Sequence, residues 1–154
     1  MGDRAIFAGF CVGTAAFCAD LLTKSYAVTH LSTAALVFNH KPAELPKRIA
    51  MCVIAIAVAA VLAHFARQRG IGRIWGAWIG VGLLVAGVLG NGISTYLWSR
   101  GVPDFFNVAG DEYWNLADFE IAIGLTGGIV SIGATALIAY VRERLSASAD
   151  AQKS

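Results

Sequence analysis

Residues 74–97 read IWGAWIGVGLLVAGVLGNGISTYL, an apolar run without an acidic or basic side chain. Its length is close to the roughly 20 residues that a helix needs to cross the hydrocarbon core of a bilayer. Lipid offers no hydrogen-bond partners to the backbone, and no segment of the chain shows the alternating pattern of a membrane β-barrel. The run therefore predicts a membrane-spanning helix.

Three further apolar runs of similar length lie on either side of it, at residues 5–22, 49–66 and 119–141. They leave only short connections, so we expect residues 1–154 to form a single integral membrane domain. The chain is 57% hydrophobic and 14% charged, whereas a typical soluble domain is about 25% charged. The predicted fold class is an all-α membrane protein, a bundle of four transmembrane helices.

Glycines are frequent in two of these runs, and we interpret them as faces where helices pack closely rather than as a phosphate-binding loop. They are Gly80, Gly82, Gly87, Gly90 and Gly92 in the third run, and Gly124, Gly127, Gly128 and Gly133 in the fourth.

The lysines and arginines determine the expected orientation. Most lie near the N-terminus, in the turn between the second and third runs, or in the C-terminal tail. Because cytoplasmic segments are enriched in Lys and Arg, we expect both termini in the cytoplasm. Residues 23–48 and 98–117 would then face outward, and most acidic side chains lie on or beside these segments.

The composition disfavours several partners. The formal net charge is only +2 and the basic residues are scattered, so no nucleic-acid surface is expected. Cys11, Cys18 and Cys52 lie inside apolar runs, and we interpret them as small buried side chains rather than disulfide partners. The histidines are far apart in the sequence, so a metal site is not expected either.

Two carboxylates on the expected outer side are candidates for chemistry. Asp118 lies directly before the fourth apolar run, and Asp104 lies between Pro103 and Phe105. An ionisable group at such a boundary is costly and therefore a functional candidate. Two carboxylates close together can share one proton and activate a water molecule, as in aspartic proteases. The alternative is that Asp118 caps the fourth helix and that Asp104 is a turn residue.

Five short motifs, in this order along the chain, resemble those of the lipoprotein signal peptidase (signal peptidase II) family. They are Asp20-Leu21-Leu22-Thr23-Lys24, Val37-Phe38-Asn39, Gly90-Asn91, Val102-Pro103-Asp104-Phe105 and Trp114-Asn115-Leu116-Ala117-Asp118. The similarity covers the four-span layout from Ala5 to Val141. The shared order and membrane placement of the motifs make the resemblance specific.

The resemblance implies an aspartic endopeptidase that removes the signal peptide of prolipoproteins, just before a diacylglyceryl-modified cysteine. Asp104 and Asp118 would be the catalytic dyad, and no cofactor or metal would be needed. Prolipoprotein signal peptides and membrane lipid would be the partners. The protein would lie in a bacterial inner membrane with its active face outward, towards the periplasm.

Six further residues are expected to support the site or hold the substrate: Asn115, Asn91, Asn39, Asp20, Lys24 and Arg100. Asn115 stands three residues before Asp118, so in a helix the two would share a face. Asp20 and Lys24 have the spacing of a helical ion pair, for which we expect a structural role. Asn91 and Asn39 would be polar supports near the same outer surface.

The chain departs from the family pattern in two places. Family members usually continue Gly-Asn-x-x-Asp-Arg, but here residues 92–95 read Gly-Ile-Ser-Thr, and Arg100 is the candidate to replace the arginine. Asn39 is followed by His-Lys-Pro-Ala-Glu at residues 40–44, which leaves little room for the small β-cradle that is usual in the family.

Two other functions therefore stay open at the level of sequence. One is a catalytically weak or inactive relative that binds lipidated peptides without cutting them. The other is a small proton-coupled membrane transporter in which Asp20 and Asp118 carry protons.

Overall fold

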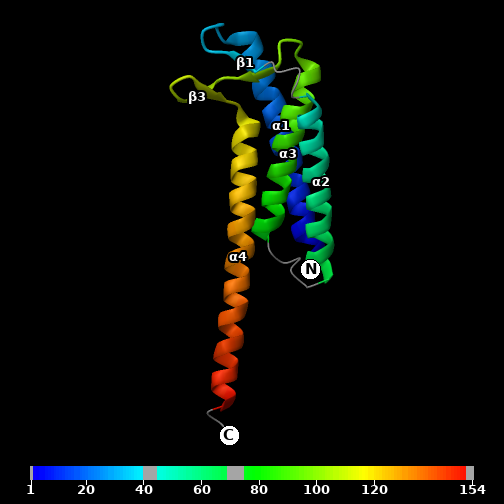
Figure 1. Cartoon of the computed structure of the whole chain (residues 1–154), viewed down its shortest axis with the longest axis vertical. Coiled ribbons are helices and arrows are strands. Elements are labelled where there is room, and N and C mark those ends of the chain that lie inside the picture. Colours follow the sequence, from blue (N-terminus) through cyan, green and yellow to red (C-terminus); the bar gives the residue numbers. More distant parts are fainter. Residues whose placement is uncertain (1, 40–44, 69–74, 152–154) are drawn as a thin grey trace.

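A computed structural model describes residues 2–39, 45–68 and 75–151 of the protein. Within these ranges the chain is mostly helical. The helices are α1 (Gly2–His30), α2 (Leu45–Gln68), α3 (Trp75–Leu97) and α4 (Leu116–Ala151). They run lengthwise beside one another, short strands gather at one end, and the C-terminal half of α4 continues beyond the other helices (Figure 1). We call the end that carries the strands the strand end.

Three helices of the described chain are long and apolar enough to cross a membrane, over Arg4–His30, Trp75–Leu97 and Leu116–Ser146. The first, third and fourth predicted spans fall on these helices. The second predicted span lies within α2, and its membrane insertion stays a prediction. Large apolar side chains on the bundle surface, such as Phe10 at 70% exposure, suit contact with lipid.

Helices α1 and α3, and likewise α3 and α4, approach closely where glycines meet. A Cβ atom added to Gly13 would lie 2.7 Å from the carbonyl oxygen of Gly82, and one added to Gly80 would lie 2.7 Å from that of Gly124. Only glycine fits such contacts without moving a helix. The packing interpretation is confirmed there, whereas Gly127 and Gly133 have nothing within 4 Å of an added Cβ.

The strand end carries four short strands, so the prediction of an all-α protein is wrong at this end. They are β1 (Val37–Asn39), β2 (Val102–Asp104), β3 (Phe106–Ala109) and β4 (Glu112–Trp114). β1 and β2 form one antiparallel pair, in which Val37 lies opposite Asp104, and β3 and β4 form another. Strands of three or four residues are too short to show a recognisable alternation of apolar and polar residues.

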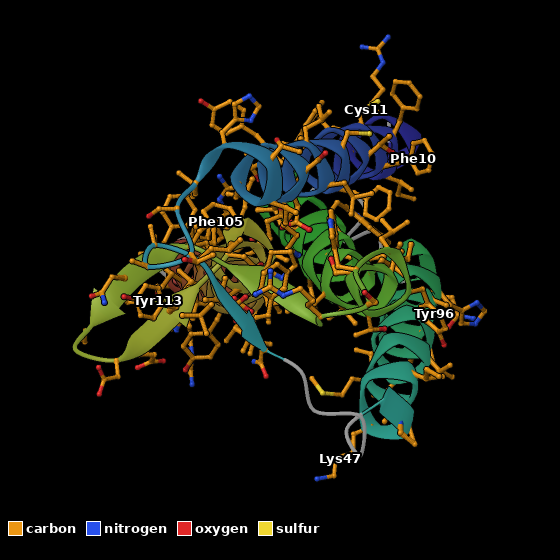
Figure 2. All side chains as sticks on the ribbon, turned by 90° about the horizontal axis from the view of Figure 1, so that it is seen from above. Phe10, Cys11, Lys47, Tyr96, Phe105 and Tyr113 are labelled. Carbon is orange, nitrogen blue, oxygen red and sulfur yellow. The ribbon has the colours of Figure 1, made fainter. Side chains whose placement is uncertain are left out.

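The cysteine prediction also needs correction. Cys11 and Cys18 are free and exposed, and Figure 2 places Cys11 beside Phe10 on the surface of α1. An apolar run in a membrane helix supplies both the packed face and the lipid face, so a cysteine within it need not be buried. The side chain of Cys52 and residues 40–44 lie outside the described residues.

Candidate active site

A cavity of about 620 Å³ opens at the strand end. Five of the residues predicted for the site line it: Asn39, Asn91, Asp104, Asn115 and Asp118. They come from β1, α3, β2, the residue before α4, and the first turn of α4. The fold therefore brings together side chains that lie far apart in the sequence, and both candidate catalytic carboxylates are among them.

Asn115 contacts both carboxylates. Its side-chain amide donates a 2.6 Å hydrogen bond to Oδ1 of Asp104, and its backbone N–H donates a 2.9 Å hydrogen bond to Oδ2 of Asp118. Asn115 is itself 1% exposed, so its two donor groups are fixed by the surrounding packing. The sequence predicted contact with Asp118 through a shared helical face, but Asn115 precedes α4 and uses its backbone instead.

Asp118 is in the first turn of α4 but is not its N-cap residue. Its carboxylate reaches back three residues to a backbone N–H, which is the geometry of the third helical residue in a capping box. Its other oxygen, Oδ1, accepts a 2.8 Å hydrogen bond from the side chain of Asn91. The Asp118 carboxylate therefore caps a backbone N–H at the start of α4 and also lines the cavity.

Asp104 is a strand residue, so its interpretation as a turn residue is wrong. It is the last residue of β2, pairs opposite Val37 of β1, and is only 5% exposed. A buried carboxylate in a paired strand is costly unless donors surround it, and Asn115 supplies one such donor.

Asp20 and Lys24 form a buried ion pair near these carboxylates. Nζ of Lys24 lies 2.7 Å from Oδ2 of Asp20, and both side chains are completely buried. The predicted helical ion pair is present. Lys24 also donates a 2.9 Å hydrogen bond to Oδ1 of Asn91, and Asn91 in turn donates to Asp118. A continuous chain of polar contacts therefore links Asp20, Lys24, Asn91 and Asp118.

Asp20 also holds the start of α4. Its Oδ1 accepts a 3.0 Å hydrogen bond from the backbone N–H of Ala117, one of the N-terminal amides that a helix cannot satisfy itself. A negative charge at a helix N-terminus is further favoured by the helix dipole. Gly90 of α3 lies directly against Oδ2 of Asp20, so a side chain there would collide with it. Asp20 thus joins α1, α3 and α4.

Arg100 is the predicted site residue that the structure places elsewhere. It is exposed, and its guanidinium lies 4.2 Å from the ring centroid of Phe38, a cation–π contact. It is not among the residues that line the cavity. Ser94, which stands where family members usually carry aspartate, is buried and bonds the carbonyl oxygen of Gly90 at 2.6 Å.

Three cavity residues with polar side chains were not singled out from the sequence: Lys47, Glu112 and Tyr113. In the view from above, Tyr113 of β4 and Lys47 of α2 lie well apart (Figure 2). The cavity therefore extends between the β3–β4 hairpin and α2. The order of residues along the chain carries no signal for this, because α2 and the hairpin are far apart in the sequence and line the same cavity only in the folded chain.

Fold and site define a small helical membrane protein with polar groups gathered at one end of the bundle. The sequence model described as Signal peptidase (SPase) II matches residues 12–134. The chain therefore belongs to the signal peptidase II family, as its motifs indicate. This is a family of membrane proteases that process lipoprotein signal peptides.

Solved structures agree with this fold. Two are described as a bacterial membrane enzyme studied by the in meso method, at 2.3 Å and 1.9 Å resolution. The first matches with a TM-score of 0.60 and 19% identity over 80% of this chain and 86% of the other. The second has a TM-score of 0.58 and 21% identity over 80% of this chain and 91% of the other. No curated protein matches the sequence.

Proposed function

We propose that this chain is an aspartic endopeptidase that cuts the signal peptide from prolipoproteins, just before a diacylglyceryl-modified cysteine. The observation that carries the proposal is the placement of Asp104 and Asp118. Both line one cavity, and both are hydrogen-bonded to Asn115. Family membership supplies the substrate class, and this pair of carboxylates supplies a chemistry for peptide hydrolysis.

The reaction needs one proton shared by the two carboxyl groups. The ionised carboxylate takes a proton from a water molecule, and the oxygen of that water attacks the scissile carbonyl carbon. The protonated carboxyl gives its proton to the carbonyl oxygen as the tetrahedral intermediate forms. Collapse of the intermediate breaks the C–N bond. The carboxyl group that took the proton from water gives it to the leaving amine, and a hydroxyl of the intermediate gives its proton to the other carboxylate. The two roles belong to Asp104 and Asp118 as a coupled pair.

The substrate places demands on where this cavity lies. A diacylglyceryl group anchors the cleavage point at the membrane surface, so the carboxylates have to lie near one end of the spanning helices. The strand-end cavity meets this demand and combines its polar groups with apolar side chains, among them Met51, Val88 and Ile121. The apolar side chains suit the lipidated part of the substrate.

We propose further that all four helices span the inner membrane of a bacterium, with both termini in the cytoplasm and the strand end outward. The bias of Lys and Arg supports this orientation. It places the candidate carboxylates at the periplasmic surface.

A relative that binds lipidated peptides without cutting them is the second candidate. One observation favours it: among the described residues, no arginine lines the cavity, and Arg100 contacts Phe38 instead. Binding with no turnover under any condition would support this candidate.

The proposed activity is tested with the purified protein in proteoliposomes. The substrate is a prolipoprotein that carries the diacylglyceryl cysteine, and the control is the same precursor without the lipid. We expect release of the signal peptide from the lipidated precursor, with mass spectrometry locating the cut directly before the modified cysteine. Absence of cleavage, or a cut elsewhere, would overturn the proposal.

A further inference from the structure

Glu120 is a third buried carboxyl group near the site, and the proposed mechanism does not use it. It lies on α4, is 5% exposed, and is not among the residues that line the cavity. The backbone of α3 passes close by, because a Cβ atom added to Gly87 would lie 3.1 Å from Cβ of Glu120. Its carboxyl group is therefore enclosed within the helix bundle.

Both carboxyl oxygens of Glu120 lack a hydrogen-bond partner within the described part of the chain. Burying an ionised carboxylate without a partner is far more costly than burying a neutral carboxyl group, so such a group favours its protonated form. Glu120 thus differs from Asp20, Asp104 and Asp118, each of which accepts at least one hydrogen bond from a nearby donor.

The charges around Glu120 do not provide a counterion for it. The charged groups that act on it are Asp20 and Lys24 of α1. α3 contains no acidic or basic residue, and Asp118 lies two residues earlier on α4 itself. Lys24 is the one buried cation among the described residues, and it is already paired with Asp20 at 2.7 Å.

Lys24 also connects this interior to the proposed dyad. Its ammonium donates to Asn91, and Asn91 donates to Asp118. A second negative charge near Asp20 would compete with Asn91 for the Lys24 ammonium and weaken its bond to Asn91. Asp118 would then lose the support of an oriented Asn91.

We propose that Glu120 is a positioning residue that holds a proton inside the bundle and so leaves the Lys24 ammonium to Asp20 and Asn91. Ionisation of Glu120 breaks the hydrogen bond from Lys24 to Asn91. Asp118 then loses the oriented donor that Asn91 provides. Protonation is tested independently of any activity, whereas the consequence for cleavage rests on the proposed function.

The first measurement is infrared spectroscopy of the full chain in proteoliposomes, which detects the C=O stretch of protonated carboxylic acids. We compare the parent with Glu120→Gln, and with Asp111→Asn as a control on the exposed β3–β4 turn. At neutral pH the glutamine variant should lose one protonated-acid band and the control should lose none. If Glu120→Gln loses no band, the proposal is wrong. Should that variant not fold, Glu120→Asp should shift the same band rather than remove it.

The second measurement is the pH dependence of cleavage. As the band of Glu120 disappears at alkaline pH, the rate of the parent should fall about tenfold per pH unit, because only the protonated form keeps Asp118 in place. Asp104 and Asp118 are present in all three proteins, so any fall that they cause appears in all three. The additional fall should occur in the parent and in Asp111→Asn but not in Glu120→Gln.

Identical alkaline profiles for the parent and Glu120→Gln would overturn the coupling to Asp118. A parent that never cleaves contradicts the proposed function instead, and the infrared comparison then still decides whether Glu120 holds a proton.

Discussion

Single residues determine how the two candidate carboxylates are held. Asn115 donates to both, and Lys24 reaches Asp118 through Asn91. Local spacing in the sequence predicted the Asp20/Lys24 ion pair, because residues four apart in a helix are neighbours. The hydrogen bond from Ala117 to Asp20 joins residues 97 positions apart, and no local pattern encodes it. The same holds for the link from Lys24 to Asn91.

Removing the side chain of Asn115 should slow catalysis. Asn115→Ala leaves the backbone donor to Asp118 but removes the 2.6 Å hydrogen bond to Asp104. A hydrogen bond to a charged group contributes about 1.5–3 kcal/mol, so we expect a loss of about 10- to 150-fold in kcat/KM of the folded protein. Asn107→Ala is the matched control, because that asparagine is exposed and its side chain donates to the carbonyl oxygen of Gly110 within the β3–β4 hairpin. Equal values of kcat/KM for the two variants would show that the Asn115 side chain does not contribute to catalysis.

Removing Asp20 should affect folding before it affects turnover. Asp20→Ala leaves Lys24 buried without its counterion and Ala117 without its acceptor. Breaking one partner of a buried ion pair typically costs about 3–5 kcal/mol. We therefore expect much less folded protein than for Asp111→Ala, measured by size-exclusion chromatography in detergent, and cleavage per folded molecule that falls less. A well-folded but inert Asp20→Ala protein would place Asp20 in the catalytic machinery.

At the scale of elements, apolar runs predict helices well but locate their ends poorly. α1 continues eight residues beyond Leu22 to His30, and α4 continues from Val141 to Ala151. Neither extension contains glycine or proline, so nothing in the local sequence stops the helix. The last apolar residue of a span therefore does not mark the last residue of its helix. The strands, in contrast, depend on pairing between distant segments such as β1 and β2.

Close packing of α3 and α4 gives a prediction at this scale. A Cβ at position 80 would lie 2.7 Å from the carbonyl oxygen of Gly124 and 2.9 Å from the backbone of Gly128. Gly80→Ala should therefore push the helices apart and destabilise the fold by about 1–3 kcal/mol. Gly127→Ala is the control, because nothing lies within 4 Å of an added Cβ there. Thermal unfolding in detergent should show a lower midpoint for Gly80→Ala alone, and equal midpoints contradict the packing described.

For the whole molecule, composition and charge predict how the chain is arranged in the membrane, whereas the site depends on the three-dimensional fold. Apolar runs predicted a helical membrane protein, and three helices of the described chain have the required length and hydropathy. The motifs predicted a set of polar site residues, and five of these residues line one cavity, whereas their roles stay predictions. The positions of Arg100 and Glu120 depend on how the helices and strands pack, which no linear motif records.

Cysteine accessibility tests the proposed orientation. In a background without Cys11, Cys18 and Cys52, single cysteines at Ser154 and Asp111 should react with membrane-impermeant reagents from opposite sides. Asp111 should be labelled from the periplasm, because it lies on the strand end of the bundle, and Ser154 only after the membrane is opened. Labelling of both from the same side would be incompatible with four spans.

The central claim is that Asp104 and Asp118 act as one catalytic unit, and amide substitutions test it most directly. Asp104→Asn and Asp118→Asn keep the size of the side chain but cannot share a proton, so each should abolish cleavage while the protein stays folded. The amide oxygen of an asparagine at this third helical position can still accept from the backbone N–H of Asn115, so a role limited to the helix start predicts that Asp118→Asn keeps its activity.

The measurement is release of the signal peptide from a diacylglyceryl prolipoprotein in reconstituted membranes, with folding of each variant checked by thermal unfolding. The account predicts no turnover in either single variant, and a double variant scarcely worse than either one, because the residues act together. Cleavage retained by either folded single variant would contradict the account.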